Sequence, residues 1–223
     1  MSTAEGILSE IRELTSELIS SGLCVDQNFP AMRTGAGGVI SIDISGEEER
    51  DLSVTLKNIP YSESYAVLVS QRSFNLKMID GGLIQMMYQF RNRELINHRL
   101  AFFPSPDLLE YQNNPDIYET DEMYGDIVSR NIVTSPIRFD FDRDNFVEND
   151  HPMSHLTIGQ YKNCRIPVSG PLSPFLFLNF ILRAFYNTPF RKYCSDIKRR
   201  EYTFSSSITK SEMLNTHIQA CSA

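Results

Sequence analysis

Apolar residues near the N-terminus recur every three or four positions, as on one face of a helix. This stripe consists of Ile7, Ile11, Leu14 and Leu18. Ser2 and Glu5 have the spacing of a capping box, in which each side chain satisfies a backbone N–H of the other residue. The pattern therefore predicts an amphipathic helix over residues 3–21 that packs against a larger element.

A second helix is predicted over residues 174–186, where apolar side chains point in nearly every direction around the axis. A helix that is apolar all round is typically buried. Ser173 is suited to cap it, and Pro174 to occupy its first position. We expect a basic segment at residues 188–223 to follow, with a last short helix near its C-terminal end, at about 210–219.

Alternating apolar and polar residues predict an antiparallel meander over residues 74–103. An Asp-Gly-Gly hairpin signal at residues 80–82 and a short turn at 92–93 separate its three strands. Shorter strands are predicted at residues 39–44, 137–142, 156–158 and 164–168. Residues 62–71 suit either a helix or a strand, because they combine helical spacing with β-branched valines.

These elements predict an α+β fold, in which an antiparallel β-meander sheet packs against a buried helix from the C-terminal half, with an amphipathic N-terminal helix. No stretch of the chain has the composition of a linker, so we expect a single domain over residues 1–223. Its parts are the N-terminal helix (3–21), the meander (74–103), a motif-rich block (136–187) and the basic C-terminal segment (188–223).

The net charge of −7 is unevenly distributed along the chain. Residues 107–150 contain twelve acidic and three basic residues, whereas residues 183–210 contain seven basic and two acidic ones. The basic stretch is compatible with contacts to a phosphate backbone. It is equally compatible with a solvated face, or with ion pairs to the acidic segment of the same protein.

The sequence also indicates a cellular compartment. No apolar run reaches the ~20 residues that a membrane-spanning helix needs, and the N-terminus lacks the basic and apolar regions of a secretory signal. The four cysteines form no CxxC pair, which argues against a disulfide framework or a structural zinc site. We therefore expect a cytoplasmic protein with reduced thiols and no membrane partner.

Strand alternation at residues 137–142 places Arg138, Asp140 and Asp142 on one face. Two carboxylates on one strand face can hold a hard divalent cation such as Mg²⁺. The alternative is that these carboxylates pair with the neighbouring cations Arg138 and Arg143, as at an ordinary strand edge.

His151 and His155 have the spacing of a helical metal site, but Pro152 between them argues against a helix. On an extended chain, both imidazoles can converge with Asp140 or Asp142 to bind manganese, iron or zinc. They can instead act as general acid and base, because imidazole titrates near neutral pH. The remaining alternative is a structural pair whose ring nitrogens bind buried backbone groups.

Three motifs resemble a bacterial family of unknown function. They are Arg-Phe-Asp-Phe-Asp at residues 138–142, His-Pro-Met-Ser-His-Leu at 151–156 and Cys-Arg-Ile-Pro-Val-Ser-Gly-Pro-Leu-Ser-Pro at 164–174. More distantly, the layout resembles TumE-like toxins, which have a meander with an Asp-Gly turn, an Arg-aromatic-Asp segment and a histidine cluster. This resemblance implies that His151 and His155 match the cluster, with Thr157 in place of a further histidine. It also implies a bacterial stress or antiphage module with a partner protein.

We accordingly expect a component of a bacterial defence or toxin–antitoxin-type complex that has a protein partner and acts on nucleic acid. The candidate site comprises His151, His155, Arg138, Arg165, Asp140 and Asp142. In a catalytic version, the histidines are acid and base, the arginines face phosphate charge and the carboxylates hold a divalent metal. The alternative is a non-catalytic adaptor that binds a partner ATPase or nuclease through the first helix or residues 113–126.

Overall fold

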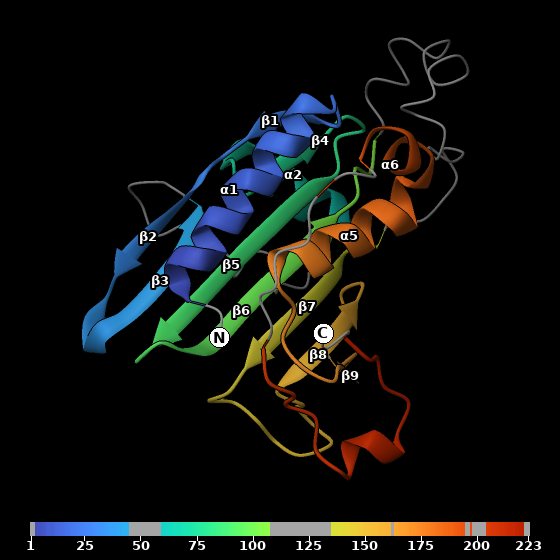
Figure 1. Ribbon diagram of the computed structural model, residues 1–223. Coiled ribbons are helices and arrows are strands. Elements are labelled where there is room, and N and C mark those ends of the chain that lie inside the picture. The colour runs from blue at the N-terminus through green and yellow to red at the C-terminus, as the bar shows by residue number, and fades with distance from the viewer. Residues whose placement is uncertain are drawn as a thin grey trace.

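The computed structural model describes residues 3–44, 59–107, 135–161, 163–194, 197 and 204–220. Within these residues, the centre of the fold is a nine-stranded antiparallel sheet (Figure 1). The strands are β1 (Cys24–Gln27), β2 (Pro30–Thr34), β3 (Val39–Ile44), β4 (Leu76–Met78), β5 (Leu83–Arg91), β6 (Glu94–Phe103), β7 (Ile137–Asp142), β8 (Ser154–Ile158) and β9 (Ile166–Pro167). Their order is β1-β4-β5-β6-β7-β8-β9, and β2 joins through β3, which pairs with β5.

Helices cover both faces of this sheet. The helices are α1 (Ala4–Ser20), α2 (Tyr61–Ser70), α5 (Pro174–Phe185) and α6 (Asn187–Tyr193), with short 3₁₀ helices η1 (Ala36–Gly38) and η4 (Glu212–Leu214). In Figure 1, α1 and α5 lie in front of the sheet, and α2 lies behind it. The predicted α+β class is therefore confirmed, and the meander of β4, β5 and β6 forms the middle of a larger antiparallel sheet.

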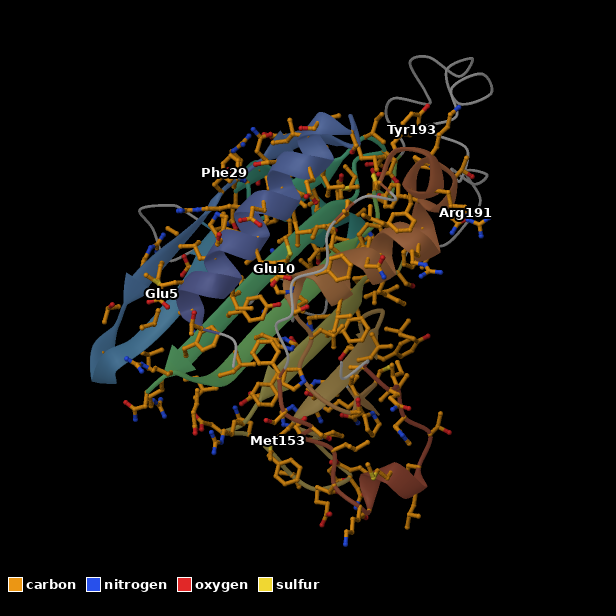
Figure 2. All side chains as sticks on the ribbon, viewed as in Figure 1. Glu5, Glu10, Phe29, Met153, Arg191 and Tyr193 are labelled. Carbon is orange, nitrogen blue, oxygen red and sulfur yellow. The ribbon has the colours of Figure 1, made fainter. Side chains whose placement is uncertain are left out.

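The N-terminal helix packs as its pattern predicted. The four apolar residues of its stripe are at most 2% exposed and belong to the main core. The side chain of Thr3 caps the helix, because its hydroxyl oxygen accepts a hydrogen bond from Gly6 N at 3.1 Å. The proposed capping residue Ser2 lies outside the described residues. Glu10, labelled in Figure 2, belongs to the same helix and is 2% exposed.

A second, smaller core lies on the opposite face of the sheet. Tyr65 and Leu68 of α2 pack there against Leu83, Ala101 and Phe103 of β5 and β6. Most of the ambiguous residues 62–71 therefore form a helix. This helix, α2, covers apolar side chains on this face of the meander, which would otherwise be exposed to solvent.

The helix α5 begins at the predicted cap, where Ser173 Oγ accepts a hydrogen bond from Leu176 N at 3.3 Å. One side of the helix, including Phe177, is buried in the main core. Phe180 and Phe185 remain 38% and 36% exposed, so the expectation of burial all round is wrong for these two residues. Single helices that lie on a sheet keep one side toward solvent.

The C-terminal segment differs from its prediction. The prediction of a helix at about 210–219 is wrong, because only the short 3₁₀ helix η4 is present there. Beyond it, Ile218 N donates to Pro167 O at 2.8 Å, and Ser169 N donates to Ile218 O at 2.8 Å. Backbone pairing beside β9 thus replaces helical hydrogen bonds. The helix α6 lies at the start of the basic C-terminal segment, where no helix was predicted, and the strands β1 and β2 were not predicted either.

Several expectations concern residues that the structure describes only in part. Residues 113–126, one of the two surfaces considered for an adaptor, lie outside the described residues. None of the described helices is long and apolar enough to cross a membrane. Cys24, Cys164 and Cys194 are free thiols, and Cys221 lies outside the described residues. The single-domain organisation stays a prediction.

Candidate functional site

The register of three neighbouring strands brings charged residues into one row. On β6 and β7, Arg99 lies opposite Asp140, and on β7 and β8, Asp140 lies opposite His155. Arg99 is two residues before Ala101, which packs under α2. Because alternate residues of a strand share a face, the row lies on the α2 side of the sheet.

Asp140 binds two arginines at once. Its Oδ2 accepts a hydrogen bond from Arg138 Nε at 2.5 Å, and its Oδ1 accepts one from Arg99 Nε at 3.4 Å. Burial by itself raises the pKa of Asp140, but the positive charges of Arg138 and Arg99 outweigh burial and hold this pKa below its usual range. The carboxylate is therefore ionised at neutral pH.

His155 is buried beside this carboxylate. Its side chain is 4% exposed, its Nε2 lies 3.8 Å from Asp140 Oδ2, and its Nδ1 lies 2.9 Å from Pro152 O. A carbonyl oxygen only accepts, so Nδ1 carries the proton and Nε2 presents a lone pair. Burial lowers the pKa of His155, against the opposing effects of the Pro152 carbonyl and of Asp140. The ring is therefore neutral at pH 7.

His151 lies next to His155 but reaches further toward solvent. The two imidazole ring centroids are 5.0 Å apart. Asn145 O lies 2.5 Å from His151 Nδ1, so Nδ1 is again the donor. Within the described residues, His151 Nε2 makes no hydrogen bond. The loop that carries His151 closes on itself through a bridge between Val147 and His151. It leads into β8 through Met153, which is labelled in Figure 2.

The other predicted site residues make different contacts. Arg165 Nη1 donates to Asp150 O at 3.4 Å, so this arginine holds the loop of His151. Asp142 accepts hydrogen bonds from Asp144 N and from both nitrogens of Asn145, at 2.8 to 3.2 Å. Asp142 therefore shapes the turn after β7 and does not converge with Asp140.

These contacts bear on the metal hypothesis. The oxygens of Asp140 are engaged by guanidinium groups, and those of Asp142 by amide groups, so neither carboxylate fits the role of a cation ligand. Among the described residues, no group of three or more His, Cys, Asp or Glu side chains is arranged to hold a metal ion. Metal binding by Asp140 and Asp142 stays a prediction without support from their geometry.

Two residues of this region were not among the candidates. Arg99 joins the site through strand register, which no local sequence pattern specifies. The neighbouring His98 points to the other face, where its side chain is 1% exposed and its Nε2 accepts from Leu172 N at 3.2 Å. Burial lowers the pKa of His98 to about 4, so it is a neutral core residue. The alternation of side chains along residues 95–103 could have shown that Arg99 and His98 point to opposite faces of the sheet.

Comparisons with known proteins assign the chain to a family. No curated protein and no solved structure matches the chain significantly. The family model DUF2290, described as an uncharacterized conserved protein, matches residues 23–220. This range includes every residue of the row and of the loop that carries His151. The chain therefore belongs to the DUF2290 family.

Proposed function

We propose that this protein is a cytoplasmic component of a bacterial defence or toxin–antitoxin-type complex, and that it acts on nucleic acid through the His151 site. One observation carries the proposal. Two histidine rings lie 5.0 Å apart, and one of them, His155, lies beside the ionised carboxylate of Asp140, which itself binds two arginines. The biological context rests on the motif-level resemblance to TumE-like toxins.

The two histidines have different roles in this proposal. His151 acts as the general base, because its Nε2 carries a lone pair and makes no hydrogen bond within the described residues. Nε2 accepts the proton of the attacking hydroxyl group as the new P–O bond forms, the P–O bond to the leaving oxygen breaks, and water protonates that oxygen. His155 packs against the His151 ring and, with Asp140, fixes its surroundings. Arg138 offers positive charge to a phosphate, where negative charge develops during phosphodiester cleavage. Arg165 keeps the loop of His151 in place through Asp150 O.

A cleavage assay with matched variants tests the proposal. Wild type, His151→Gln and His217→Gln are incubated with labelled single-stranded RNA, single-stranded DNA and duplex DNA, with Mg²⁺ or with EDTA. His217 is exposed, and among the described residues its only hydrogen bond is to the nearby Asn215 O, so its variant controls for the loss of one imidazole. We expect His151→Gln to lower the cleavage rate about 100-fold or more, and His217→Gln to leave it unchanged.

Circular dichroism shows whether each variant is folded. If wild type cleaves none of these substrates, or if folded His151→Gln cleaves at the rate of wild type, the proposed catalytic role is wrong. The EDTA arm shows in the same experiment whether a divalent cation takes part.

The second candidate function is a non-catalytic adaptor. The burial of His155, 4% exposed with Nδ1 bound to Pro152 O, favours it, since a structural histidine has these properties. The first helix is a poor adaptor surface, because its apolar stripe is already buried in the core. If the protein is an adaptor, cells with His151→Gln keep the wild-type phenotype. His155→Gln, in contrast, lowers the unfolding temperature of the protein and weakens the phenotype.

A further inference from the structure

Arg99 and Arg138 hold Asp140 in an unusual way. Each arginine binds the carboxylate through Nε, and the two occupy different oxygens. Both guanidinium groups thus face Asp140 with Nε rather than with the two terminal nitrogens Nη1 and Nη2. Another carboxylate-bound arginine of this protein behaves differently: Arg72 binds Asp26 with Nη1 and Nη2, at 2.7 and 2.8 Å. The bidentate pair is the geometry that maximises an ion pair for its own sake.

The side-on geometry leaves donors available. Within the described residues, the Nη1 and Nη2 atoms of Arg99 and Arg138 make no hydrogen bond, and none of these four atoms is among the buried polar atoms that lack a partner. They therefore reach solvent. The two side chains are only 25% and 19% exposed, so a ligand at these atoms is partly desolvated and feels less screening than on an open surface.

The charge of the cluster selects an anion. Two guanidinium groups and one ionised carboxylate leave one net positive charge, and neutral His155 adds none. The carboxylate is shielded on both oxygens by the Nε groups, and it holds the two guanidinium planes in place. Planar guanidinium forks match the oxygens of a phosphate group, which accepts several hydrogen bonds at once.

We propose that Arg99 and Arg138 form a binding site for one phosphate group of a nucleic acid, with Asp140 as the positioning residue. This inference rests on the proposed function and deepens it by naming the phosphate group as the part of the substrate that is bound and Arg99 as a residue that recognises it. The phosphate at this site is next to the histidine pair, because Asp140 contacts both Arg138 and His155.

Binding is measured without reference to cleavage. Inorganic phosphate and a fluorescein-labelled single-stranded RNA that carries 2′-O-methyl groups, and is therefore not cleaved through its 2′-hydroxyls, are titrated into wild type, Arg99→Gln, Arg99→Lys and Arg143→Gln. Arg143 makes an exposed ion pair with Glu94, so its variant loses the same charge away from the cluster. Side-chain Nε–H signals in ¹H–¹⁵N spectra report the phosphate titration, and fluorescence anisotropy reports the RNA titration.

We expect phosphate to shift the Nε–H signals of Arg99 and Arg138 saturably. We expect Arg99→Gln to weaken RNA binding about tenfold or more, and Arg143→Gln to weaken it less than about twofold. Arg99→Lys keeps the charge but loses the planar fork, so it binds more weakly than wild type. The salt dependence of log Kd also decreases by about one unit of slope in Arg99→Gln.

The outcomes separate this inference from the proposed function. If folded Arg99→Gln binds RNA as wild type does, or if it weakens binding no more than Arg143→Gln, the phosphate site is wrong even if the protein cleaves RNA. If wild type binds RNA through Arg99 but cleaves no substrate, the phosphate site stands and the catalytic proposal fails. If Arg99→Gln does not fold, the comparison of Arg99→Lys with wild type decides, and equal affinities overturn the inference.

Discussion

Nε2 of His155 lies 3.8 Å from Oδ2 of Asp140, directly across the strand pair β8–β7. The same carboxylate binds Arg99 from β6 and Arg138 from β7. Asp140 thus contacts side chains from three adjacent strands, β6, β7 and β8. A single carboxylate of this kind affects stability, the orientation of the arginines and the environment of the histidine pair, and each effect has its own test.

Replacing Asp140 separates the arginines from their counter-charge. In Asp140→Asn, two partly buried guanidinium groups repel each other without an anion between them, so we expect the free energy of unfolding to fall by about 1–3 kcal/mol. The estimate is below that for a fully buried pair because the arginines are 19–25% exposed. Urea denaturation measures the loss. Asp144→Asn, the same change at an exposed position, is the control, and equal losses in the two variants would contradict the role of Asp140.

Buried histidines make the protein sensitive to acid. Burial lowers the pKa of His98 from 6.5 to about 4 and also lowers the pKa of His155, so below pH 6.5 the unfolded chain binds more protons than the folded one. The contribution of these two histidines to stability is therefore fully present above pH 6.5 and decreases as the pH falls toward 4. His98 alone contributes about 3 kcal/mol to this decrease.

Urea denaturation at several pH values between 7 and 4 tests this dependence. The decrease should be smaller in His98→Gln, which has no group to protonate at this position. The lowered pKa of Asp140 acts only at more acidic pH, since its stabilising effect is present above 3.8 and is lost as the pH falls below that value. An unchanged slope in folded His98→Gln would show that His98 is not the responsible group.

The hairpin turn between β4 and β5 requires a glycine at position 82. A Cβ atom there would lie 2.6 Å from Tyr186 Oη and 2.9 Å from the Phe102 ring. We expect Gly82→Ala to lower the free energy of unfolding by about 1–3 kcal/mol. Gly35→Ala should cost much less, because the nearest atom that its Cβ would meet among the described residues is Val39 O at 3.7 Å.

A double variant tests the cause of that loss. Tyr186→Phe removes the hydroxyl that the new Cβ would meet, together with its 2.7 Å hydrogen bond to Asp80. In a thermal-unfolding cycle, Gly82→Ala should cost less in the Tyr186→Phe background than in wild type. Additive losses would mean that the hydroxyl is not the source of the clash.

The C-terminal segment is tied to the His151 loop through Asn149. Its side-chain amide exchanges hydrogen bonds with Ser211 and accepts one from Asn215 Nδ2, at 2.9 to 3.3 Å. Asn149 has φ of +65°, which glycine adopts without strain, so Asn149→Gly removes these bonds and keeps the backbone. We expect faster hydrogen exchange in residues 204–220 and a stability loss of about 1–2 kcal/mol. Exchange in α1 is the internal control, and unchanged exchange in residues 204–220 would contradict this link.

Periodicity in the sequence determined the elements whose physics is local. The stripe of α1, the Ser173 cap of α5 and the alternation of β5, β6 and β7 follow from spacing alone, because a helix or strand repeats its environment at a fixed interval. The same alternation correctly placed Arg138 and Asp140 on one side of β7, where the two side chains form an ion pair.

Only the tertiary structure decided which of these side chains meet. Strand pairing placed Arg99 opposite Asp140, although 41 residues separate them. It also left Asp142 in a turn, where it caps backbone N–H groups rather than joining Asp140. Register depends on packing over the whole sheet, and a strand's own sequence specifies its face but not its partner. The sequence by itself therefore indicated Arg138, Asp140 and the histidine pair as candidates, and the fold determined that Arg99 lies in the same cluster.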